Sequence, residues 1–297
     1  MTALRLGTRR SPLALAQTAY VAARLRECGV ETQVVEVETS GDRRRHEALS
    51  SLGGQGVFAV EIQRALLDRE VDAAVHSAKD LPSTSPEGLV LACVPERRDA
   101  ADVLVGRSLA GLGPGASVAT GSPRRRALLL ERRPDLNVVE LRGNMATRLA
   151  RAGTDVDAVI AAAAALERLG EGAKIAERLD PTWFVPQVGQ GALAIEARFD
   201  DDAVRGALAL IDDGYAHAAL RAERSFLRTL GAGCTVPAGA HATHHAGELA
   251  LSGVMLASDG SLSVRAVMHG ADPEDLGARL ATHLADERHG HDLAGWA

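Results

Sequence analysis

The sequence of 297 residues is poor in cysteine and in aromatic residues, and it has no long hydrophobic run. Its three cysteines, Cys28, Cys93 and Cys234, form no CxxC pair, which argues against a disulfide framework and against a cysteine zinc site. No run of about 18 apolar residues is present to cross a bilayer, and the N-terminal segment reaches arginines after only a few apolar residues. We therefore expect a soluble cytoplasmic protein with no membrane partner.

Lysine is almost absent, since it occurs only at Lys79 and Lys174. Nearly all of the 33 basic residues are therefore arginines, whose forked guanidinium groups suit the capture of carboxylates and phosphates. The formal net charge of -6 gives no reason to expect binding to nucleic acid. With 46% hydrophobic residues, the chain can bury a full core over two or three domains.

The segment from Val71 to Pro82, VDAAVHSAKDLP, combines a buried strand with a group of ionisable side chains. Its first residues, up to Val75, suit a strand that is covered on both faces, as in a parallel sheet flanked by helices. Lys79 and Asp80 follow close behind, and in open α/β sheets ligands bind beyond the carboxyl ends of the strands. The segment alone leaves two interpretations open, a ligand site and a solvated turn.

Two stretches far apart in the sequence follow the same order of strand, Thr/Ser/Arg turn and helix. In the first, a strand at Ala3–Gly7 leads through the turn TRRS into a helix at Pro12–Cys28. In the second, a strand at Ser117–Ala119 leads through TGSP into a helix at Arg124–Arg133. A serine followed by proline is typical of a helix start, and the free amides and dipole of the first helix favour an anion site there.

This repeated order predicts an α/β fold with two similar domains around a cleft, followed by a small α+β domain. The first domain is expected at residues 1–97 and 190–214, the second at 98–189 and the third at 215–297. The segment Val185–Ala197 is a candidate hinge, with a strand that crosses back to the first domain. Arginines gather at the strand-to-helix junctions of the second domain, although each one alone could be a solvated surface residue. They are Arg124, Arg125, Arg126, Arg142, Arg148 and Arg168.

Cys234 differs from the other cysteines because the glycine before it and Pro237 after it place it on a tight loop beyond a helix, where a thiol is accessible. Taken alone, it can be an incidental residue or a functional one. His241, His244 and His245 have no recognised zinc spacing and no adjacent carboxylate or cysteine partner. We therefore predict no metal site.

Six segments spread over nearly the whole chain resemble the porphobilinogen deaminase family, also called hydroxymethylbilane synthases, and they occur in the family's order. The segments are GTRRSPLAL at 7–15, AVHSAKDLP at 74–82, ATGSPRRRAL at 119–128, LRGNMATRL at 141–149, VGQGALAIE at 188–196 and GAGCTVPAGA at 231–240. None is decisive alone, but six in register are highly specific. The chain departs from the family at Ser51 and Gln55, where many members carry lysines, and at Pro123.

The resemblance implies a transferase of tetrapyrrole (porphyrin and heme) biosynthesis. It would join four porphobilinogen molecules head to tail, with release of ammonia, into linear hydroxymethylbilane. The resemblance also implies two domains like type II periplasmic binding proteins, a small third domain, and a dipyrromethane cofactor joined to Cys234 by a thioether. Asp80 matches the family's catalytic carboxylate. The residues that the resemblance assigns to cofactor or substrate carboxylates are Arg9, Ser11, Lys79, Thr120, Ser122, Arg124, Arg125, Arg142, Arg148 and Arg168.

Two other functions use the same predicted fold. A binding protein for an anionic small molecule would use the two-domain cleft to hold its ligand without catalysis, but this function leaves Cys234 without a role. The ligand domain of a regulator is a weaker alternative, because no convincing helix-turn-helix segment is present. Since no long heptad pattern predicts pairing with a partner helix, we expect a monomer.

Overall fold

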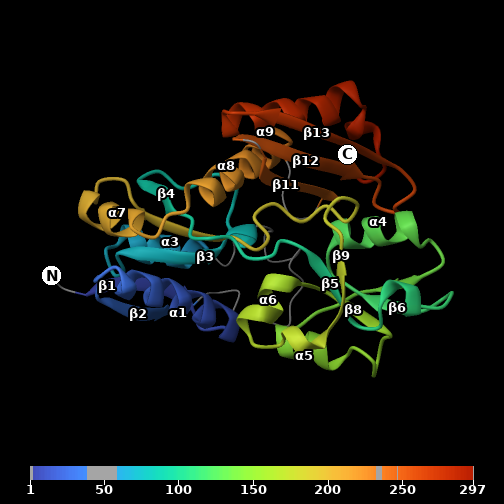
Figure 1. Cartoon of the computed structure of the whole chain (residues 1–297), viewed down its shortest axis with the longest axis horizontal. Helices are drawn as coiled ribbons and strands as arrows, with labels where there is room; N and C mark the ends of the chain where they lie inside the picture. Colours follow the sequence, from blue (N-terminus) through green and yellow to red (C-terminus); the bar gives the residue numbers. More distant parts are fainter. Residues whose placement is uncertain (1–2, 39–58, 232–235, 246, 297) are drawn as a thin grey trace. The chain divides into compact units, whose positions relative to one another are not determined.

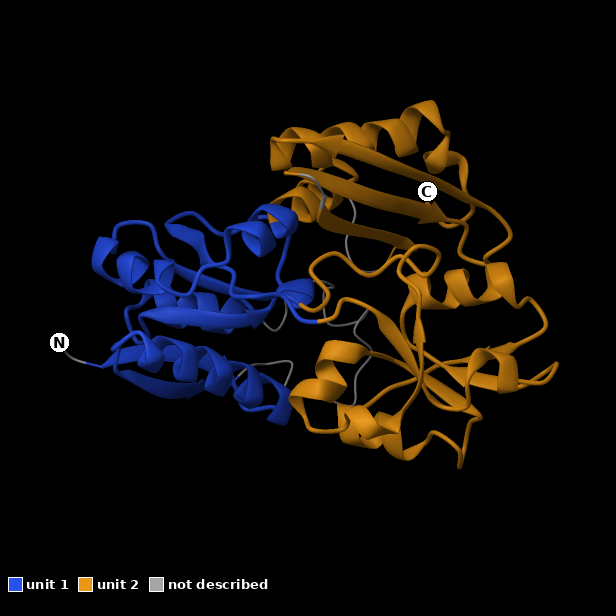
Figure 2. Cartoon of the chain, viewed as in Figure 1, with its two compact units in different colours: residues 1–98, 192–220 blue, residues 99–191, 221–297 orange. Residues whose placement is uncertain are grey.

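The computed structural model of the chain describes residues 3–38, 59–231, 236–245 and 247–296 (Figure 1). The chain divides into two compact units (Figure 2). Unit 1 comprises Met1–Arg98 and Ala192–Leu220, and unit 2 comprises Asp99–Gly191 and Arg221–Ala297. Each helix in the described ranges is too short or too polar to cross a membrane.

Unit 1 is built on a five-stranded sheet with the strand order β2-β1-β3-β10-β4. Its strands are β1 (Leu4–Arg9), β2 (Thr32–Val37), β3 (Ala73–Ser77), β4 (Leu89–Cys93) and β10 (Leu193–Arg198). β1 is parallel to β2 and β3, whereas β10 is antiparallel to β3 and β4. The predicted return of the chain to the first sheet is therefore confirmed by β10. The helices of this unit are α1 (Pro12–Glu27), α3 (Val60–Leu67) and α7 (Asp202–Ala209).

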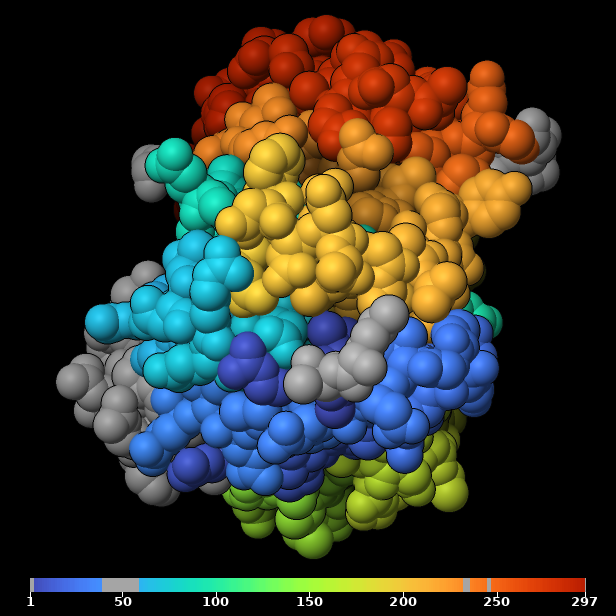
Figure 3. Space-filling view, turned by 90° about the vertical axis from the view of Figure 1, so that its left-hand side faces the viewer, coloured from blue at the N-terminus to red at the C-terminus, as the bar shows by residue number. Residues whose placement is uncertain are grey.

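The core of unit 1 forms where the apolar face of α1 covers the sheet. Leu6 on β1 packs with Val21 and Leu25 of α1, and all three side chains are fully buried. Val204 and Leu208 of α7 join the same cluster. Figure 3 shows this side of the molecule, where the yellow surface of the α7 segment adjoins the blue surface of the α1 segment. Burial of apolar area on this scale is the main force that holds the layers together.

Unit 2 contains a second five-stranded sheet, with the order β7-β6-β8-β5-β9. Its strands are β5 (Asp102–Gly106), β6 (Ser117–Ala119), β7 (Asn137–Val139), β8 (Ala158–Ala162) and β9 (Ile175–Leu179), and its helices are α4 (Pro123–Arg132), α5 (Met145–Ala150) and α6 (Ala163–Arg168). β6 is parallel to β7 and β8, whereas β5 is antiparallel to β8 and β9. The strand order and directions match those of unit 1, although the antiparallel strand comes last along the chain in unit 1 (β10) and first in unit 2 (β5). The predicted fold class, two similar α/β domains of the type II periplasmic-binding-protein kind, is thus confirmed.

The C-terminal part of the chain adds an antiparallel sheet of three strands to unit 2. Its elements are α8 (Gly214–Thr229), β11 (Ala238–His245), β12 (Glu248–Leu256), β13 (Ser263–Gly270) and α9 (Pro273–Thr282). Residues 258–260 lie in the connection between β12 and β13. Val254 and Leu256 of β12 share a core cluster with Leu104 of β5, so this sheet packs on the rest of unit 2. Its separation as a third domain stays a prediction.

Short helical turns complete the fold. They are the 3-10 turns η1 (Ala78–Asp80), η2 (Leu109–Gly111), η3 (Gly172–Lys174) and η5 (Gly290–Asp292), and the π-helical turn η4 (His283–Glu287). The turn η1 leaves β3 directly, and it carries two of the predicted site residues.

Candidate functional site

Asp80 lies at the end of the turn that follows β3, where the buried strand gives way to solvent. The turn is fixed by its backbone, since the amide of Ala78 donates to the carbonyl of Ala192 at 3.1 Å. Leu81, the next residue, is buried, whereas Asp80 itself is exposed and Lys79 is half-buried. The chain is therefore anchored on both sides of a carboxylate that faces outward, which agrees with the prediction of polar groups beyond the strand.

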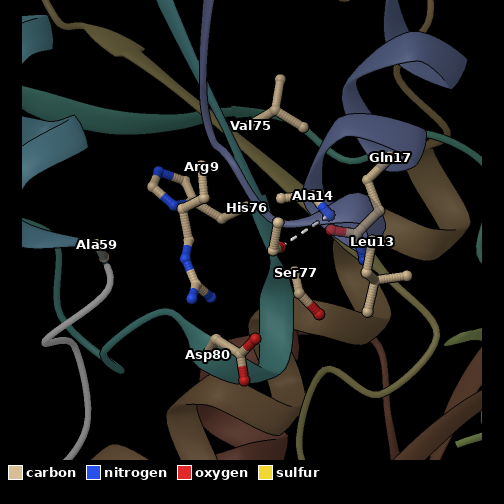
Figure 4. A pocket seen from close by; sticks show the side chains of 10 residues that line it. Arg9, Leu13, Ala14, Gln17, Ala59, Val75, His76, Ser77 and Asp80 are labelled. Atoms are coloured by element: carbon tan, nitrogen blue, oxygen red, sulfur yellow. Dashed lines mark hydrogen bonds between the residues drawn. The ribbon is translucent and has the colours of Figure 1, made fainter. Parts of the chain in front are cut away.

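A pocket in unit 1 brings Asp80 together with residues of the β1–α1 junction (Figure 4). Arg9 comes from the end of β1, and its guanidinium extends into the same space that the Asp80 carboxylate faces. The pocket is lined by Arg9, Ser11, Leu13, Ala14, Gln17, Ala59, Val75, His76, Ser77 and Asp80. An arginine and an aspartate in one pocket can bind a ligand that carries both a carboxylate and an N–H donor.

Ser11 places the N-terminus of α1 at this pocket. Its hydroxyl accepts a hydrogen bond from the amide of Ala14 at 3.3 Å, and Pro12 occupies the first helical position. The predicted N-cap is thus confirmed. Because amide groups at a helix start carry partial positive charge, they add to Arg9 in favouring an anion.

Behind the pocket lies a buried polar network that was not predicted from the sequence. Glu196 of β10 is fully buried, and its carboxylate accepts hydrogen bonds from Gln63 Nε2 and Ser85 Oγ, both at 2.8 Å. His76 Nε2 lies 3.3 Å from Glu196 Oε2. Burial alone would raise the pKa of Glu196, but the contact with His76 and the two neutral donors outweigh it and hold the pKa below its usual value. A glutamate inside the apolar run GALAIEA was the available signal.

In unit 2, the second strand-to-helix junction repeats the capping chemistry of the first. Ser122 caps α4 by accepting from the amide of Arg125 at 3.4 Å, and Pro123 takes the first helical position, one residue before the predicted helix start at Arg124. Thr120 is buried, and its hydroxyl oxygen accepts from the amide of Ser122 at 3.2 Å. Proline at a helix start is compatible with this geometry, so Pro123 does not disturb the turn.

Arg124 and Arg125 of this junction are buried against Asp102. Arg124 Nη2 lies 2.7 Å from Asp102 Oδ2, and Arg125 Nη2 lies 2.6 Å from Oδ1. Burial opposes the charge of Asp102, but the two guanidinium groups lower its pKa to about 2. The predicted role of both arginines in binding ligand carboxylates stays a prediction, and the structure adds that each already holds a carboxylate of the protein.

Two more buried polar residues, also missed from the sequence, tie segments of unit 2 together. Gln190 donates from Nε2 to Asp102 Oδ1 at 3.0 Å and to the carbonyl of Ala100 at 2.7 Å. Glu223 of α8 is fully buried and accepts from the amides of Gly189 at 2.7 Å and Ala242 at 2.8 Å. These contacts fix the candidate hinge segment to β5 and to the helix that precedes Cys234.

The remaining predicted arginines of unit 2 lie near the surface. Arg142 is exposed, with its Nε 3.7 Å from Glu140. Arg148 donates from Nε to the carbonyl of Gly143 at 2.8 Å, and Arg168 donates from Nη2 to the carbonyl of Gly191 at 2.9 Å. Arg148 and Arg168 thus each donate to a backbone carbonyl, whereas Arg142 lies beside a carboxylate.

Some predicted features fall outside the described residues. They are Cys234, which was predicted to carry the cofactor, and Ser51 and Gln55, where the chain departs from the family pattern. Within the described ranges, no group of three or more His, Cys, Asp or Glu side chains is arranged to hold a metal ion.

Comparison with protein-family models and with curated proteins gives consistent matches over the whole chain. Residues 4–206 match the family model "Porphobilinogen deaminase, dipyromethane cofactor binding domain", and residues 217–286 match "Porphobilinogen deaminase, C-terminal domain". The porphobilinogen deaminase of Bacillus pumilus is 41% identical over 97% of this chain and 95% of its own length. That of Deinococcus radiodurans is 45% identical over 96% of both chains.

Similar solved structures include two binding proteins. One is an ABC transporter substrate-binding protein from Coxiella burnetii, 17% identical, which covers 72% of this chain and 94% of its own with a TM-score of 0.44. The other is a nutrient-binding protein from Burkholderia cenocepacia bound to methionine, 17% identical, which covers 75% of this chain and 94% of its own with a TM-score of 0.43.

Proposed function

Because the chain belongs to the porphobilinogen deaminase family, we propose that it condenses four porphobilinogen molecules head to tail, releases ammonia at each condensation and takes up one water to release linear hydroxymethylbilane. The protein is an enzyme of the transferase class, and it belongs to tetrapyrrole biosynthesis. The observation that carries the proposed mechanism is the presence of Asp80 and Arg9 in one pocket.

The matched family model is a dipyrromethane cofactor binding domain, and the residues of the pocket fit that group. A dipyrromethane carries acetate and propionate side chains and two pyrrole N–H groups, so it needs cations and a hydrogen-bond acceptor. Arg9 and the N-terminus of α1 offer the former, and Asp80 offers the latter. When bound, the cofactor supplies the primer for chain growth. We propose that the thiol of Cys234 carries it as a thioether.

Asp80 is the proposed catalytic carboxylate. Loss of ammonia from porphobilinogen leaves a cationic, electrophilic azafulvene, and its positive charge develops on the pyrrole ring. A fixed carboxylate that accepts the pyrrole N–H stabilises this charge as it forms, and it can also take up or return a proton between steps. The exposed position of Asp80 on an anchored turn suits both tasks.

The other predicted residues are proposed to bind the carboxylates of the cofactor and the growing chain. Each added unit brings one acetate and one propionate, so the ligand becomes steadily more anionic and needs many cations. The residues in this role are Arg9, Ser11, Lys79, Thr120, Ser122, Arg124, Arg125, Arg142, Arg148 and Arg168. For the pair on Asp102, Arg124 and Arg125, we propose that Asp102 presets their orientation before any ligand carboxylate arrives.

We further propose that the protein works as a monomer in the cytoplasm, with neither nucleic acid nor membrane as a partner. The net charge of -6 supports this view, because it disfavours both nucleic acid and an anionic lipid surface.

The intact mass of the purified chain tests the proposal. We expect the parent to be heavier than its sequence by two linked pyrroles and to release ammonia from porphobilinogen. Cys234→Ser should lack both the added mass and the activity. Cys28→Ser is the matched control, because Cys28 is an exposed cysteine with no proposed role, and it should keep both. A parent chain without the added mass, or a Cys234→Ser chain that retains it, would contradict the proposal.

A further inference from the structure

His76 and Glu196 are diagonal neighbours on one face of the unit 1 sheet. His76 of β3 is opposite Ala194 of β10, and Glu196 lies two residues further along β10. Residues two apart on a strand share a face, and a diagonal pair across two strands is within reach of long side chains. The distance of 3.3 Å between His76 Nε2 and Glu196 Oε2 agrees with this arrangement.

His76 lies close enough to Glu196 to pair with its buried carboxylate. Glu196 is fully buried, yet its pKa lies below the usual value, so its carboxylate is ionised at neutral pH. A buried carboxylate is costly unless it is paired. Gln63 and Ser85 are neutral donors to it. Among the contacts of Glu196 in the described part of the chain, His76 is the only side chain that can carry a positive charge.

His76 connects this buried carboxylate to the ligand pocket. Its side chain lines the pocket together with Arg9 and Asp80 (Figure 4), although it is only 7% exposed. Asp80 follows four residues later, on the turn that leaves the same strand. The imidazole ring is therefore part of the pocket wall, and it also contacts the Glu196 carboxylate, which is shielded from solvent.

We propose that His76 and Glu196 form a positioning pair, in which the buried Glu196 carboxylate holds the His76 imidazole in one orientation beside Arg9 and Asp80. This proposal rests on the proposed function, because it requires a pyrrole ring to occupy the pocket. A fixed ring in the wall limits the positions that a planar pyrrole can take next to Asp80. Small displacements from the productive geometry cost up to about 10²-fold in rate, so the pair acts on turnover, while the arginines provide affinity.

Glu196→Gln tests the pair with a nearly isosteric change. The amide removes the charge and keeps the size of the side chain. At saturating porphobilinogen, we expect kcat to fall about tenfold or more and KM to stay within about threefold of the parent value. His76→Ala is the second variant. We expect a similar loss of kcat and partial recovery on addition of imidazole, which is small enough to replace the missing ring.

Asp72→Asn is the matched control. Asp72 directly precedes β3, forms a half-buried ion pair with Arg5 at 2.7 Å and does not line the pocket. The substitution should lower the unfolding temperature and leave kcat unchanged.

The proposal is overturned if Glu196→Gln and His76→Ala both have the kcat of the parent. It is also overturned if imidazole restores none of the kcat that His76→Ala has lost. It is also overturned if only KM changes. Failure of the proposed function is a separate result, because the parent itself would then leave porphobilinogen unchanged.

Discussion

Units 1 and 2 share a strand order, but a carboxylate near a strand end is exposed in unit 1 and buried in unit 2. In unit 1, Asp80 follows β3 on an exposed turn and faces a pocket. In unit 2, Asp102 begins β5 and is fully buried beneath Arg124 and Arg125. A position at a strand end therefore does not by itself decide what a carboxylate does. Burial and partners decide whether it stabilises the fold or faces a ligand.

The difference predicts separable effects on stability and activity. Two cations and an anion in the interior depend on one another, and loss of the anion leaves uncompensated buried charge. An exposed carboxylate has water as an alternative partner, so its loss costs the fold little. Each carboxylate thus serves as the control for the other.

The largest effect on stability is expected for Asp102→Asn. The free energy of unfolding should fall by about 3–5 kcal/mol, because both guanidinium groups lose their buried counter-charge. Urea unfolding followed by circular dichroism measures the change. Asp80→Asn should differ from the parent by less than about 0.5 kcal/mol in the same experiment. Equal stability of the two variants would show that the contrast between the units is wrong.

The largest effect on activity is expected for Asp80→Asn. Turnover of porphobilinogen should fall by about 10²- to 10³-fold, because the developing positive charge loses its fixed acceptor. Steady-state kinetics at saturating substrate measures the loss, and the added mass on the chain should persist. If Asp80→Asn turns over porphobilinogen at the parent rate, Asp80 has no part in the mechanism.

The two sheets, the helix caps and the turn at Asp80 could be predicted from the sequence, because the contacts that determine them are local. The repeated order of strand, turn and helix gave the two sheets. The caps by Ser11 and Ser122, each followed by proline, are set by neighbouring residues. The exposed turn at Asp80 follows from the change of polarity after β3, where Lys79 and Asp80 stand next to each other at the end of an apolar strand.

The buried networks could not be predicted, because their partners come together only in the folded chain. Gln63 and Glu196 are 133 residues apart, and Gln190 and Asp102 are 88 residues apart. The sequence indicates that an acid lies in an apolar strand, but not which base reaches it. For the same reason, Arg124 and Arg125 could be expected at the junction, while their burial on Asp102 could not.

Acid pH should reduce the difference between the parent and Asp102→Asn. The pKa of Asp102 is about 2 in the folded protein and about 4 in the unfolded chain, so the unfolded state binds the proton first as pH falls. The stabilising contribution is complete above about pH 5 and is lost as pH falls towards 2. It amounts to roughly 2 kcal/mol. Between pH 6 and pH 3 about half of this contribution, roughly 1 kcal/mol, should be lost. Urea unfolding at the two pH values measures the change, and the carboxylates common to both proteins cancel in the difference. A constant difference between the two pH values would contradict the assignment.

The smallest effects are expected for the two helix caps, which are the feature that units 1 and 2 share most closely. Ser11→Ala and Ser122→Ala should each lower the free energy of unfolding by about 1 kcal/mol, because each hydroxyl accepts from one amide of the first turn. Ser11 also lines the pocket, and a lost hydrogen bond to a charged ligand should raise KM for porphobilinogen about tenfold. Asp272→Ala removes the cap of α9, a position with no proposed ligand, and should lower stability alone. If Ser11→Ala has the KM of Asp272→Ala, the hydroxyl at the start of α1 serves only to cap its helix, and the anion must then be held by Arg9 and the α1 amides.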